Sequence, residues 1–303
     1  MTKANSHIWE WNDLNVSWKV EGSKIEKNFA TLLVHGFGAS KEHWRQNQKI
    51  LGEQSPCYSI DLIGFGSSSQ PRAKLDGDLS SQNDFSYNFD NWSHQIAEFS
   101  QSVIKKPVIL IGNSIGGVIA LRAAQIMKSS CKGVILINCA QRTMDDKRLY
   151  EQPKFMRHIR PLLKALIRKR WLSKNLFKNA ANPKFIRKVL EKAYPSGANI
   201  DTELINMIHS PTQREGASEA FHGFVNIFND YLATELMENL DLPVDLIWGE
   251  SDPWEAIDEA RYWASSINCV RSLEVINGAG HCPHDECPEK VNNRLLKIIQ
   301  DAT

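Results

Sequence analysis

The stretch that most constrains the fold runs from Pro107 to Leu121 and reads P-V-I-L-I-G-N-S-I-G-G-V-I-A-L. Its residues 108–111 form a continuous apolar run, which is typical of a strand that is buried on both faces. From Val118 onward the apolar residues continue as a helix. The sequence therefore predicts that Ser114 lies on a very tight turn between a buried strand and a helix.

Glycines surround this serine at positions 112, 116 and 117. A side chain at Gly112 or Gly116 would collide with the neighbouring strand or helix, so the turn requires glycine there. Such a turn lifts the Ser114 hydroxyl above the positive end of the helix, where backbone N–H groups can stabilise an oxyanion. The residues G-N-S-I-G fit the nucleophile elbow pattern G-x-S-x-G in its strand–turn–helix context. An ordinary Gly-Ser turn is the alternative interpretation.

Strand and helix patterns alternate along most of the chain. An antiparallel pair of strands is expected within residues 7–20, at the edge of a sheet. The alternation predicts an α/β fold with a mainly parallel sheet that helices cover on both faces. Further strands are expected at 30–34, 57–62, 108–111, 133–138, 244–248 and 272–276, and helices at 44–51, 89–103, 257–266 and from Pro288 onward.

The alternation stops between residues 141 and 241, where only helical segments interrupted by prolines are expected. We therefore predict two parts, a core of residues 1–140 and 242–303 and a helical lid (cap) of residues 141–241. Inserted after the strand that follows the nucleophile helix, this lid would cover the serine. Residues 141–190 hold 15 Lys and Arg against 3 Asp and Glu, which leaves 21 against 32 in the rest of the chain.

One hypothesis connects this lid charge with an anionic membrane surface. Between residues 155 and 172, apolar and basic side chains alternate at helical spacing, as in amphipathic helices that lie on anionic membranes. In the alternative, the apolar face of the helix packs on the core and the charged face is solvated. The residues that the hypothesis places against lipid are Arg157, Arg160, Lys164, Arg168 and Arg170.

Composition argues against several other classes of protein. With a net charge of +1, no global field attracts nucleic acid, and we expect no such partner. The six cysteines are scattered without a C-x-x-C pair, which is typical of reduced thiols in a cytoplasmic protein. Residues 1–12 lack the pattern of a signal peptide, and no apolar run reaches the length of a membrane span. The expected location is cytoplasmic or peripheral at a membrane such as the thylakoid, and the sequence indicates no oligomeric state.

Two other residues follow strands at the same edge of the predicted sheet as Ser114. Asp252 comes after the strand at 244–248 and His281 after the last strand, which gives the chain order Ser, Asp, His. A serine hydroxyl needs a base to act as a nucleophile. We expect His281 to be that base and Asp252 to fix its tautomer. The competing residues are His35, His43 and His94 for the base, and Asp245 and Asp258 for the acid.

Two further strand ends have predicted roles. After the strand at 30–34 comes H-G-F-G, where glycines let the backbone expose its N–H groups. The amide of Phe37 is a predicted oxyanion donor with that of Ile115 as its partner, and a plain turn is the alternative. Asp61, at the end of the next strand, is expected to hold its loop by hydrogen bonds rather than to take part in chemistry.

A zinc site is a further alternative, because two histidines and two cysteines lie within residues 281–287. Their spacing fits no usual Cys/His pattern, and a metal there would consume the base that Ser114 needs. We therefore expect no metal and no cofactor.

Five stretches carry more specific motifs, which are HGFGASKEHWRQN at 35–47, SIDLIGFGSS at 59–68, GNSIGG at 112–117, WGESDPW at 248–254 and GAGHCPHDE at 278–286. They resemble the pheophytinase and chlorophyll dephytylase branch of the α/β-hydrolase superfamily, which occurs in plants and cyanobacteria. The resemblance spans nearly the whole chain. It implies a mainly parallel eight-stranded sheet with helices on both faces, and hydrolysis of a phytyl ester of chlorophyll or pheophytin, or of another lipophilic ester, without a cofactor.

The resemblance also implies roles for single residues. Ser114, Asp252 and His281 would form the catalytic triad, with the backbone N–H groups of Phe37 and Ile115 as oxyanion donors. The lid would decide the substrate, and it matches only loosely. Residues expected to contact the substrate are His35, Gly36, Asn113 and Trp254.

Other activities remain open alongside ester hydrolysis. The same triad serves C–C bond hydrolases, thioesterases and acyltransferases. A different class of function is a ligand receptor that keeps the triad and signals through a mobile lid.

Overall fold

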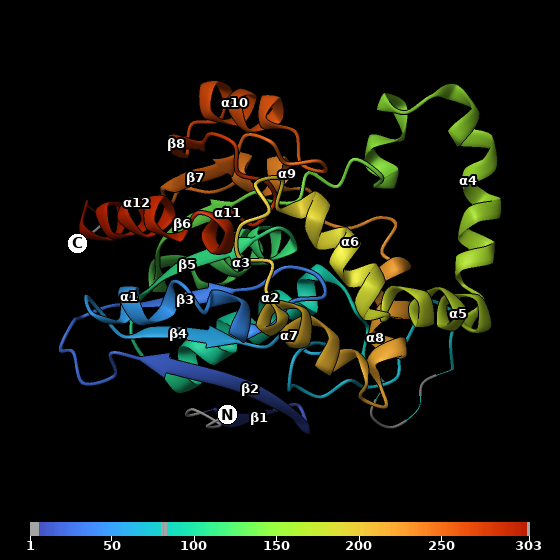
Figure 1. The fold of residues 1–303 in the computed structure, drawn as a ribbon, viewed down its shortest axis with the longest axis horizontal. Coiled ribbons are helices and arrows are strands. Elements are labelled where there is room, and N and C mark those ends of the chain that lie inside the picture. Colours follow the sequence, from blue (N-terminus) through green and yellow to red (C-terminus); the bar gives the residue numbers. More distant parts are fainter. Residues whose placement is uncertain (1–5, 80, 82–83, 302–303) are drawn as a thin grey trace.

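The computed structural model describes residues 6–79, 81 and 84–301 (Figure 1). Its strands form an eight-stranded sheet in the order β1-β2-β4-β3-β5-β6-β7-β8. These strands are β1 (His7–Trp11), β2 (Leu14–Glu21), β3 (Ala30–Val34), β4 (Cys57–Ile60), β5 (Val108–Asn113), β6 (Cys131–Ile137), β7 (Val244–Gly249) and β8 (Val270–Ile276).

The sheet is parallel except at one edge. β1 pairs antiparallel with β2, and β2 with β4, whereas the neighbours from β4 to β8 pair in parallel. The central strands β3 and β5 are buried along their whole lengths and consist mainly of apolar residues, as expected where both faces of a sheet are covered. The predicted mainly parallel eight-stranded α/β sheet with an antiparallel edge is confirmed.

Helices cover both faces of this sheet (Figure 1). Successive side chains of β5 point to opposite faces, so Leu110 joins the cluster with α2 and α3, whereas Ile109 and Ile111 join that with α1 and α12. The α-helices outside the 141–241 segment are α1 (Gln48–Gly52), α2 (Phe89–Phe99), α3 (Ile115–Met127), α10 (Ile257–Ser266), α11 (Pro283–Glu286) and α12 (Pro288–Asp301). They are joined by the short 3-10 helices η1 (Lys41–Trp44) and η3 (Lys128–Ser130) and by the π-helix η2 (Ser100–Ile104), which continues α2.

Residues 141–241 contain helices, turns and loops, as predicted. The elements are η4 (Asp146–Glu151), α4 (Lys154–Ile167), α5 (Arg170–Ala180), α6 (Pro183–Ala193), α7 (Thr202–Thr212), α8 (Ala217–Val225) and α9 (Ala233–Glu238). Three apolar residues of α9, namely Ala233, Leu236 and Met237, are buried in the main core cluster together with α3. This last helix therefore packs with the sheet, although the sequence groups it with the lid.

The helix expected between residues 44 and 51 is divided in the structure. The turn η1 ends at Trp44, and α1 begins at Gln48. Between them, the Asn47 side chain donates to the carbonyl oxygen of His284 at 2.8 Å and to Asn292 Oδ1 at 2.7 Å. Among the helices of the described residues, none is both long enough and apolar enough to span a bilayer.

Candidate active site

Ser114 lies on the turn between β5 and α3, as predicted. Its φ and ψ angles are 55° and −124°, a conformation that costs free energy in a residue with a side chain. A Cβ atom on Gly112 would lie 2.2 Å from the carbonyl oxygen of Gly116, and one on Gly116 would lie 2.3 Å from that of Val34. Backbone atoms cannot give way by this much, so both positions require glycine and the turn stays tight.

The side chains of His281 and Asp252 form a hydrogen-bonded pair. His281 Nδ1 lies 2.8 Å from Asp252 Oδ2, although 29 residues separate them in the sequence. The carboxylate also accepts from the Asn138 amide at 2.7 Å and from the N–H groups of Trp254 at 2.8 Å and Glu255 at 3.2 Å. Burial alone raises the pKa of Asp252, but the hydrogen bond and charge of His281, with the other donors, hold this pKa below its ordinary value. Asp252 is therefore an ionised partner for the histidine.

Asn138 is a site residue to which the sequence assigned no role. It directly follows β6, is fully buried and has a positive φ of 42°. While its Nδ2 donates to Asp252, its Oδ1 accepts from the N–H of Gly249 at 2.8 Å. The side chain thus connects the ends of β6 and β7 and fixes the orientation of the carboxylate. Its position directly after a strand, at the edge where the other site residues gather, is the signal that the sequence offers.

We expect Asn138→Gly to lower kcat about 10- to 100-fold with little change in KM, because a hydrogen bond to a charged group contributes about 1.5–3 kcal/mol. Glycine adopts the positive φ without strain, so this change removes the amide and keeps the turn. Steady-state kinetics with a soluble ester measures the effect, and the thermal unfolding midpoint reports any cost to the fold. An unchanged kcat would show that Asp252 does not need this amide.

Asn113 connects the loop that carries His281 with the turn that carries Ser114. Its Nδ2 donates to the carbonyl oxygens of Ile137 and His281, both at 3.1 Å. The His281 N–H donates in turn to the carbonyl oxygen of Ala193, at the end of α6, at 2.8 Å. Within the described residues, no hydrogen bond joins the Ser114 hydroxyl to the His281 ring. Contacts of this kind are often long without substrate and tighten when it binds.

The ring of His35 bonds to the backbone, whereas the sequence predicted that it contacts the substrate. Its Nδ1 lies 2.8 Å from the carbonyl oxygen of Gly36, and its Nε2 accepts from the N–H of Leu62 at 3.1 Å. Burial lowers the pKa of His35, so the ring is neutral with its proton on Nδ1. The prediction of substrate contact is therefore corrected for His35, because backbone partners occupy both nitrogens of its buried ring. Backbone carbonyl oxygens occupy the amide nitrogen of Asn113, and its expected substrate contact stays a prediction.

The predicted oxyanion donors belong to two segments that meet at Ser114. Ile115 is the first residue of α3, where a backbone N–H has no acceptor within the helix. Phe37 follows Gly36, and a Cβ atom on Gly36 would lie 3.1 Å from the Cβ of Ser114. The loop after β3 therefore passes directly beside the turn that carries Ser114.

Trp254 lies next to the histidine. The centres of its ring and the His281 ring are 5.0 Å apart at an interplanar angle of 83°, and 43% of Trp254 is exposed. Its side chain is therefore accessible to a substrate, and its expected contact stays a prediction.

Glu255 is a partly buried carboxyl near the pair that sequence analysis did not identify. Its Oε2 accepts from the N–H of Gln141 at 2.7 Å. Burial raises the pKa of Glu255 from 4.5 to about 7, and the negative charge of Asp252 contributes in the same direction. No periodicity or spacing in the sequence marks this residue, because its burial arises from the packing of the loops after β6 and β7.

We expect Glu255→Gln to flatten the pH dependence of stability between about pH 4.5 and pH 7. In this window the folded state keeps the Glu255 proton and the unfolded chain releases it, so the free energy of unfolding falls as pH rises. The effect is on the order of 1–3 kcal/mol. Urea unfolding of both proteins at about pH 5 and about pH 8 measures it. An equal loss of stability in wild type and variant would contradict the assignment.

Buried ionic groups anchor the loop that carries His281. The N–H of Gly280 donates to Glu286 at 2.6 Å, and Arg45 Nε lies 2.8 Å from the fully buried Asp285. Nearby, His284 packs against Trp44, and burial lowers the pKa of His284 well below its ordinary value. In the described part of the chain, no group of three or more His, Cys, Asp and Glu side chains is arranged to hold a metal ion.

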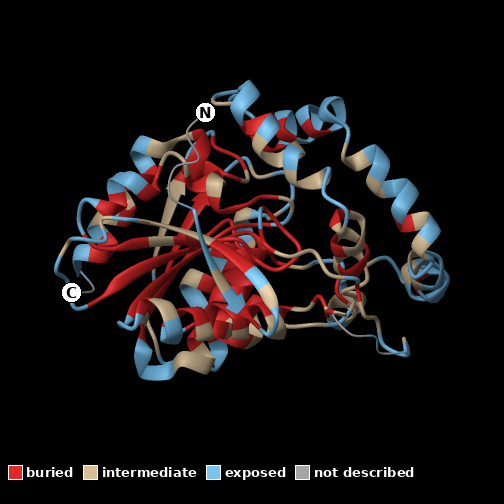
Figure 2. Cartoon of the chain, turned by 90° about the horizontal axis from the view of Figure 1, so that it is seen from below, coloured by how far each residue is buried: buried red, intermediate tan, exposed pale blue. Residues whose placement is uncertain are grey.

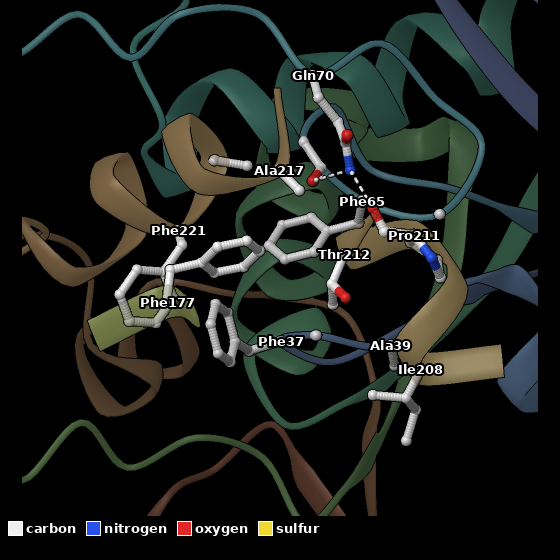
Figure 3. A pocket seen from close by; sticks show the side chains of 14 residues that line it. Phe37, Ala39, Phe65, Gln70, Phe177, Ile208, Pro211, Thr212, Ala217 and Phe221 are labelled. Carbon is white, nitrogen blue, oxygen red and sulfur yellow. Dashed lines mark hydrogen bonds between the residues drawn. The ribbon is translucent and has the colours of Figure 1, made fainter. Parts of the chain in front are cut away.

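An apolar cavity of about 60 Å³ adjoins Phe37 (Figure 3). Aromatic side chains from several segments line it, with Phe37 and Phe65 from the sheet domain, Phe177 from α5 and Phe221 from α8. The ring centres of Phe37 and Phe65 are 5.8 Å apart, and those of Phe177 and Phe221 are 5.5 Å apart. The 141–241 segment thus supplies part of an aromatic wall beside the loop that carries a predicted oxyanion donor.

Comparison with known proteins identifies relatives along most of the chain. A chloroplastic pheophytinase of Arabidopsis thaliana is 26% identical over 318 residues, covering 95% of this chain and 65% of the plant protein. The uncharacterized hydrolase YugF of Bacillus subtilis is 28% identical over 269 residues, covering 88% of each chain. The resemblance to pheophytinase that the motifs predict is thereby confirmed, and the chain spans 65% of the length of that relative.

A solved structure shares the fold of the whole chain, and a family pattern matches most of its sequence. The structure of the epoxide hydrolase CorEH matches with a TM-score of 0.77 at 17% identity and covers 99% of both chains, which shows the shared fold alone. The sequence pattern of the alpha/beta hydrolase family matches residues 31–294. This chain therefore belongs to the alpha/beta hydrolase family and is an enzyme of the hydrolase class.

Proposed function

We propose that this hydrolase cleaves a carboxylic ester with a bulky hydrophobic group and passes through an acyl-enzyme. In this proposal Ser114 is the nucleophile, His281 the general base and Asp252 the carboxylate partner of the base. The observation that carries it is the 2.8 Å hydrogen bond between His281 Nδ1 and Asp252 Oδ2. This bond keeps the Nδ1 proton in place and leaves Nε2 as the acceptor for a serine proton.

The reaction would proceed in two halves. His281 Nε2 takes the proton of Ser114 Oγ as this oxygen attacks the ester carbonyl, and the N–H groups of Phe37 and Ile115 stabilise the oxyanion that develops. The imidazolium, stabilised by the ionised Asp252, gives its proton to the leaving alcohol. A water molecule activated by the same histidine then hydrolyses the acyl-enzyme to the acid.

The apolar cavity supports a hydrophobic substrate. The rings of Phe37, Phe177 and Phe221 favour a hydrocarbon group next to the reacting carbonyl. At about 60 Å³ the cavity holds only a short part of such a group, so a long chain requires side chains of α5 or α8 to move. Among lipophilic esters, the similarity to pheophytinase makes the phytyl ester of a chlorophyll derivative the first candidate.

Incubation with a panel of lipophilic esters tests the proposal. The panel contains chlorophyll a, pheophytin a, a long-chain acylglycerol and a soluble short-chain ester, and the released alcohol is measured by chromatography. Ser114→Ala is the matched control, and labelling with a fluorophosphonate probe follows the nucleophile directly. Release of alcohol by wild type alone, with labelling that the control loses, would support the proposal. Labelling without turnover of any ester of the panel, together with turnover of an acyl thioester or a C–C substrate assayed beside it, would exclude the ester chemistry. Absence of labelling would exclude Ser114 as nucleophile.

A further inference from the structure

The helix α4 exposes the apolar stripe that a helix of a globular protein normally buries. Phe155, Ile159, Leu162 and Leu166 recur at helical spacing, and their exposed fractions are 60, 37, 63 and 43%. Within α4, Arg160 is the buried residue. Figure 2 shows this helix largely exposed. The alternative in which the apolar face packs on the core is therefore wrong for α4.

Exposed apolar side chains continue along the next two helices. Trp171 and Leu176 of α5 and Phe185 and Val189 of α6 are 64, 46, 48 and 36% exposed. The opposite face of α6 is buried against α7 in a small separate cluster, so α6 is fixed to the body and turns its other face outward. We call the exposed apolar and basic residues of α4, α5 and α6 the outer lid surface.

This surface is strongly basic. Residues 154–193 hold 13 Lys and Arg and a single acidic residue, Glu191. Four of the basic side chains bond to acidic side chains or to a carbonyl oxygen of the chain, and the other nine are exposed and form no ion pair with described residues. The four that bond to the chain are Arg160, Lys164, Arg168 and Arg170.

The ion pairs correct the hypothesis drawn from the sequence. Arg160 and Lys164 bond to Asp146. Arg170 bonds to Asp78 and Glu219. Of the five basic residues first expected to face lipid, Arg157 is the one without such a bond among the described residues. The free charge lies elsewhere on the same helices, at residues such as Lys174, Lys178 and Arg187.

We propose that the outer lid surface docks on an anionic lipid bilayer. An anionic bilayer binds protein surfaces that combine two features. Apolar side chains enter the boundary between headgroups and acyl chains, and neighbouring lysines and arginines pair with the anionic headgroups. A second copy of the chain is a poorer occupant, because two outer lid surfaces would bring like charges together. An anionic bilayer binds both the apolar and the basic side chains of the outer lid surface.

Docking at this surface would bring a membrane-borne ester close to the reacting serine. The same helix, α5, carries Trp171 and Leu176 on the outer lid surface and Phe177 in the wall of the cavity. An ester that leaves the bilayer at α5 therefore meets the aromatic cavity next to Phe37. This second step rests on the proposed ester hydrolysis, whereas docking itself does not.

Co-sedimentation of the full chain with vesicles tests the docking. Vesicles of phosphatidylcholine with phosphatidylglycerol are compared with pure phosphatidylcholine at about 0.01 M and about 1 M salt, where the Debye length falls from about 30 Å to about 3 Å. The charge variant is Lys174→Gln/Lys178→Gln/Arg187→Gln. Its matched control, Lys24→Gln/Lys49→Gln/Lys297→Gln, removes equal charge from exposed positions in the β2–β3 loop, α1 and α12. A second variant, Phe155→Ser/Leu162→Ser, removes apolar groups and leaves the charge unchanged.

We expect wild type to bind the anionic vesicles at low salt and to lose most binding at high salt. Each basic residue near the surface raises the binding constant about fivefold, so the charge variant should bind about 100-fold more weakly. The apolar variant should also bind more weakly, and the control should bind as wild type does. Absence of wild-type binding at low salt would overturn the proposal, as would an equal loss in the control. Self-association that the apolar variant loses, without vesicle binding, would assign the surface to a second copy instead.

Hydrolysis assays distinguish docking on the bilayer from transfer of a membrane-borne ester to the active site, which we call delivery. The charge variant should hydrolyse a soluble short-chain ester at the wild-type rate, because its substitutions lie outside the catalytic residues, and should lose activity on an ester embedded in anionic vesicles. Equal activity of variant and wild type on the embedded ester would overturn delivery through this surface. Vesicle binding without hydrolysis of any ester would leave docking intact and contradict the proposed function alone.

Discussion

Ser114→Ala and His281→Ala are each expected to lower kcat by about 10⁴-fold or more and to leave the fold intact. In the proposed mechanism the serine provides the attacking oxygen and the histidine accepts its proton, so neither group can complete the chemistry without the other. Asp252→Asn is expected to have an effect of similar size, because an amide at this position favours the wrong tautomer of the imidazole. Steady-state kinetics with a soluble ester measures these losses, and the thermal unfolding midpoint verifies the fold.

The double variant Ser114→Ala/His281→Ala gives the sharper test. Members of a triad act as one unit, so the double variant should be little worse than either single one. Losses that multiply would mean that the two residues act independently, and the proposed assignment would then be wrong.

Asp61→Ala is expected to lower the free energy of unfolding by about 3–5 kcal/mol, because it leaves a buried cation without its partner. Asp61 is fully buried, and its Oδ2 lies 2.8 Å from Nζ of Lys41, whose side chain is 2% exposed. The carboxylate also accepts from the N–H of Lys41 at 2.6 Å and of Ser67 at 2.8 Å. These bonds confirm the prediction that Asp61 holds its loop.

An exposed ion pair supplies the matched control for this change. Asp258 and Arg261 lie 3.0 Å apart with side chains 87% and 54% exposed, and such a pair contributes at most about 1 kcal/mol. Urea unfolding of Asp61→Ala and Asp258→Ala therefore compares a buried with a solvated carboxylate in one protein. Equal losses in the two variants would mean that water or backbone rearrangement compensates for the loss of Asp61.

Local patterns in the sequence were sufficient for the fold. The apolar run before Ser114 and the glycines around it specify a buried strand, a tight turn and a helix, and the structure has all three. The positions of Asp252 and His281 directly after strands predict that both lie at one edge of the sheet, and their side chains are 2.8 Å apart. Periodicity succeeds here because the carboxyl ends of parallel strands share an edge whatever the loops do.

Contacts between polar groups of distant segments were decided by the tertiary structure. The bond from Asn138 to Asp252 spans 114 residues, and Nε2 of His35 accepts from the N–H of Leu62, in a loop that only packing brings beside it. In the same way, the sequence identified a basic segment, but packing determined that Arg160 pairs with Asp146 and that Lys174 does not pair among the described residues. The sequence by itself determined which positions of the sheet strands and of the helices on the sheet face the core, because burial there follows the period of the strand or helix. In α4 the same helical period left the apolar stripe exposed. The partners of buried polar groups depend on which loops meet, and no local period records that.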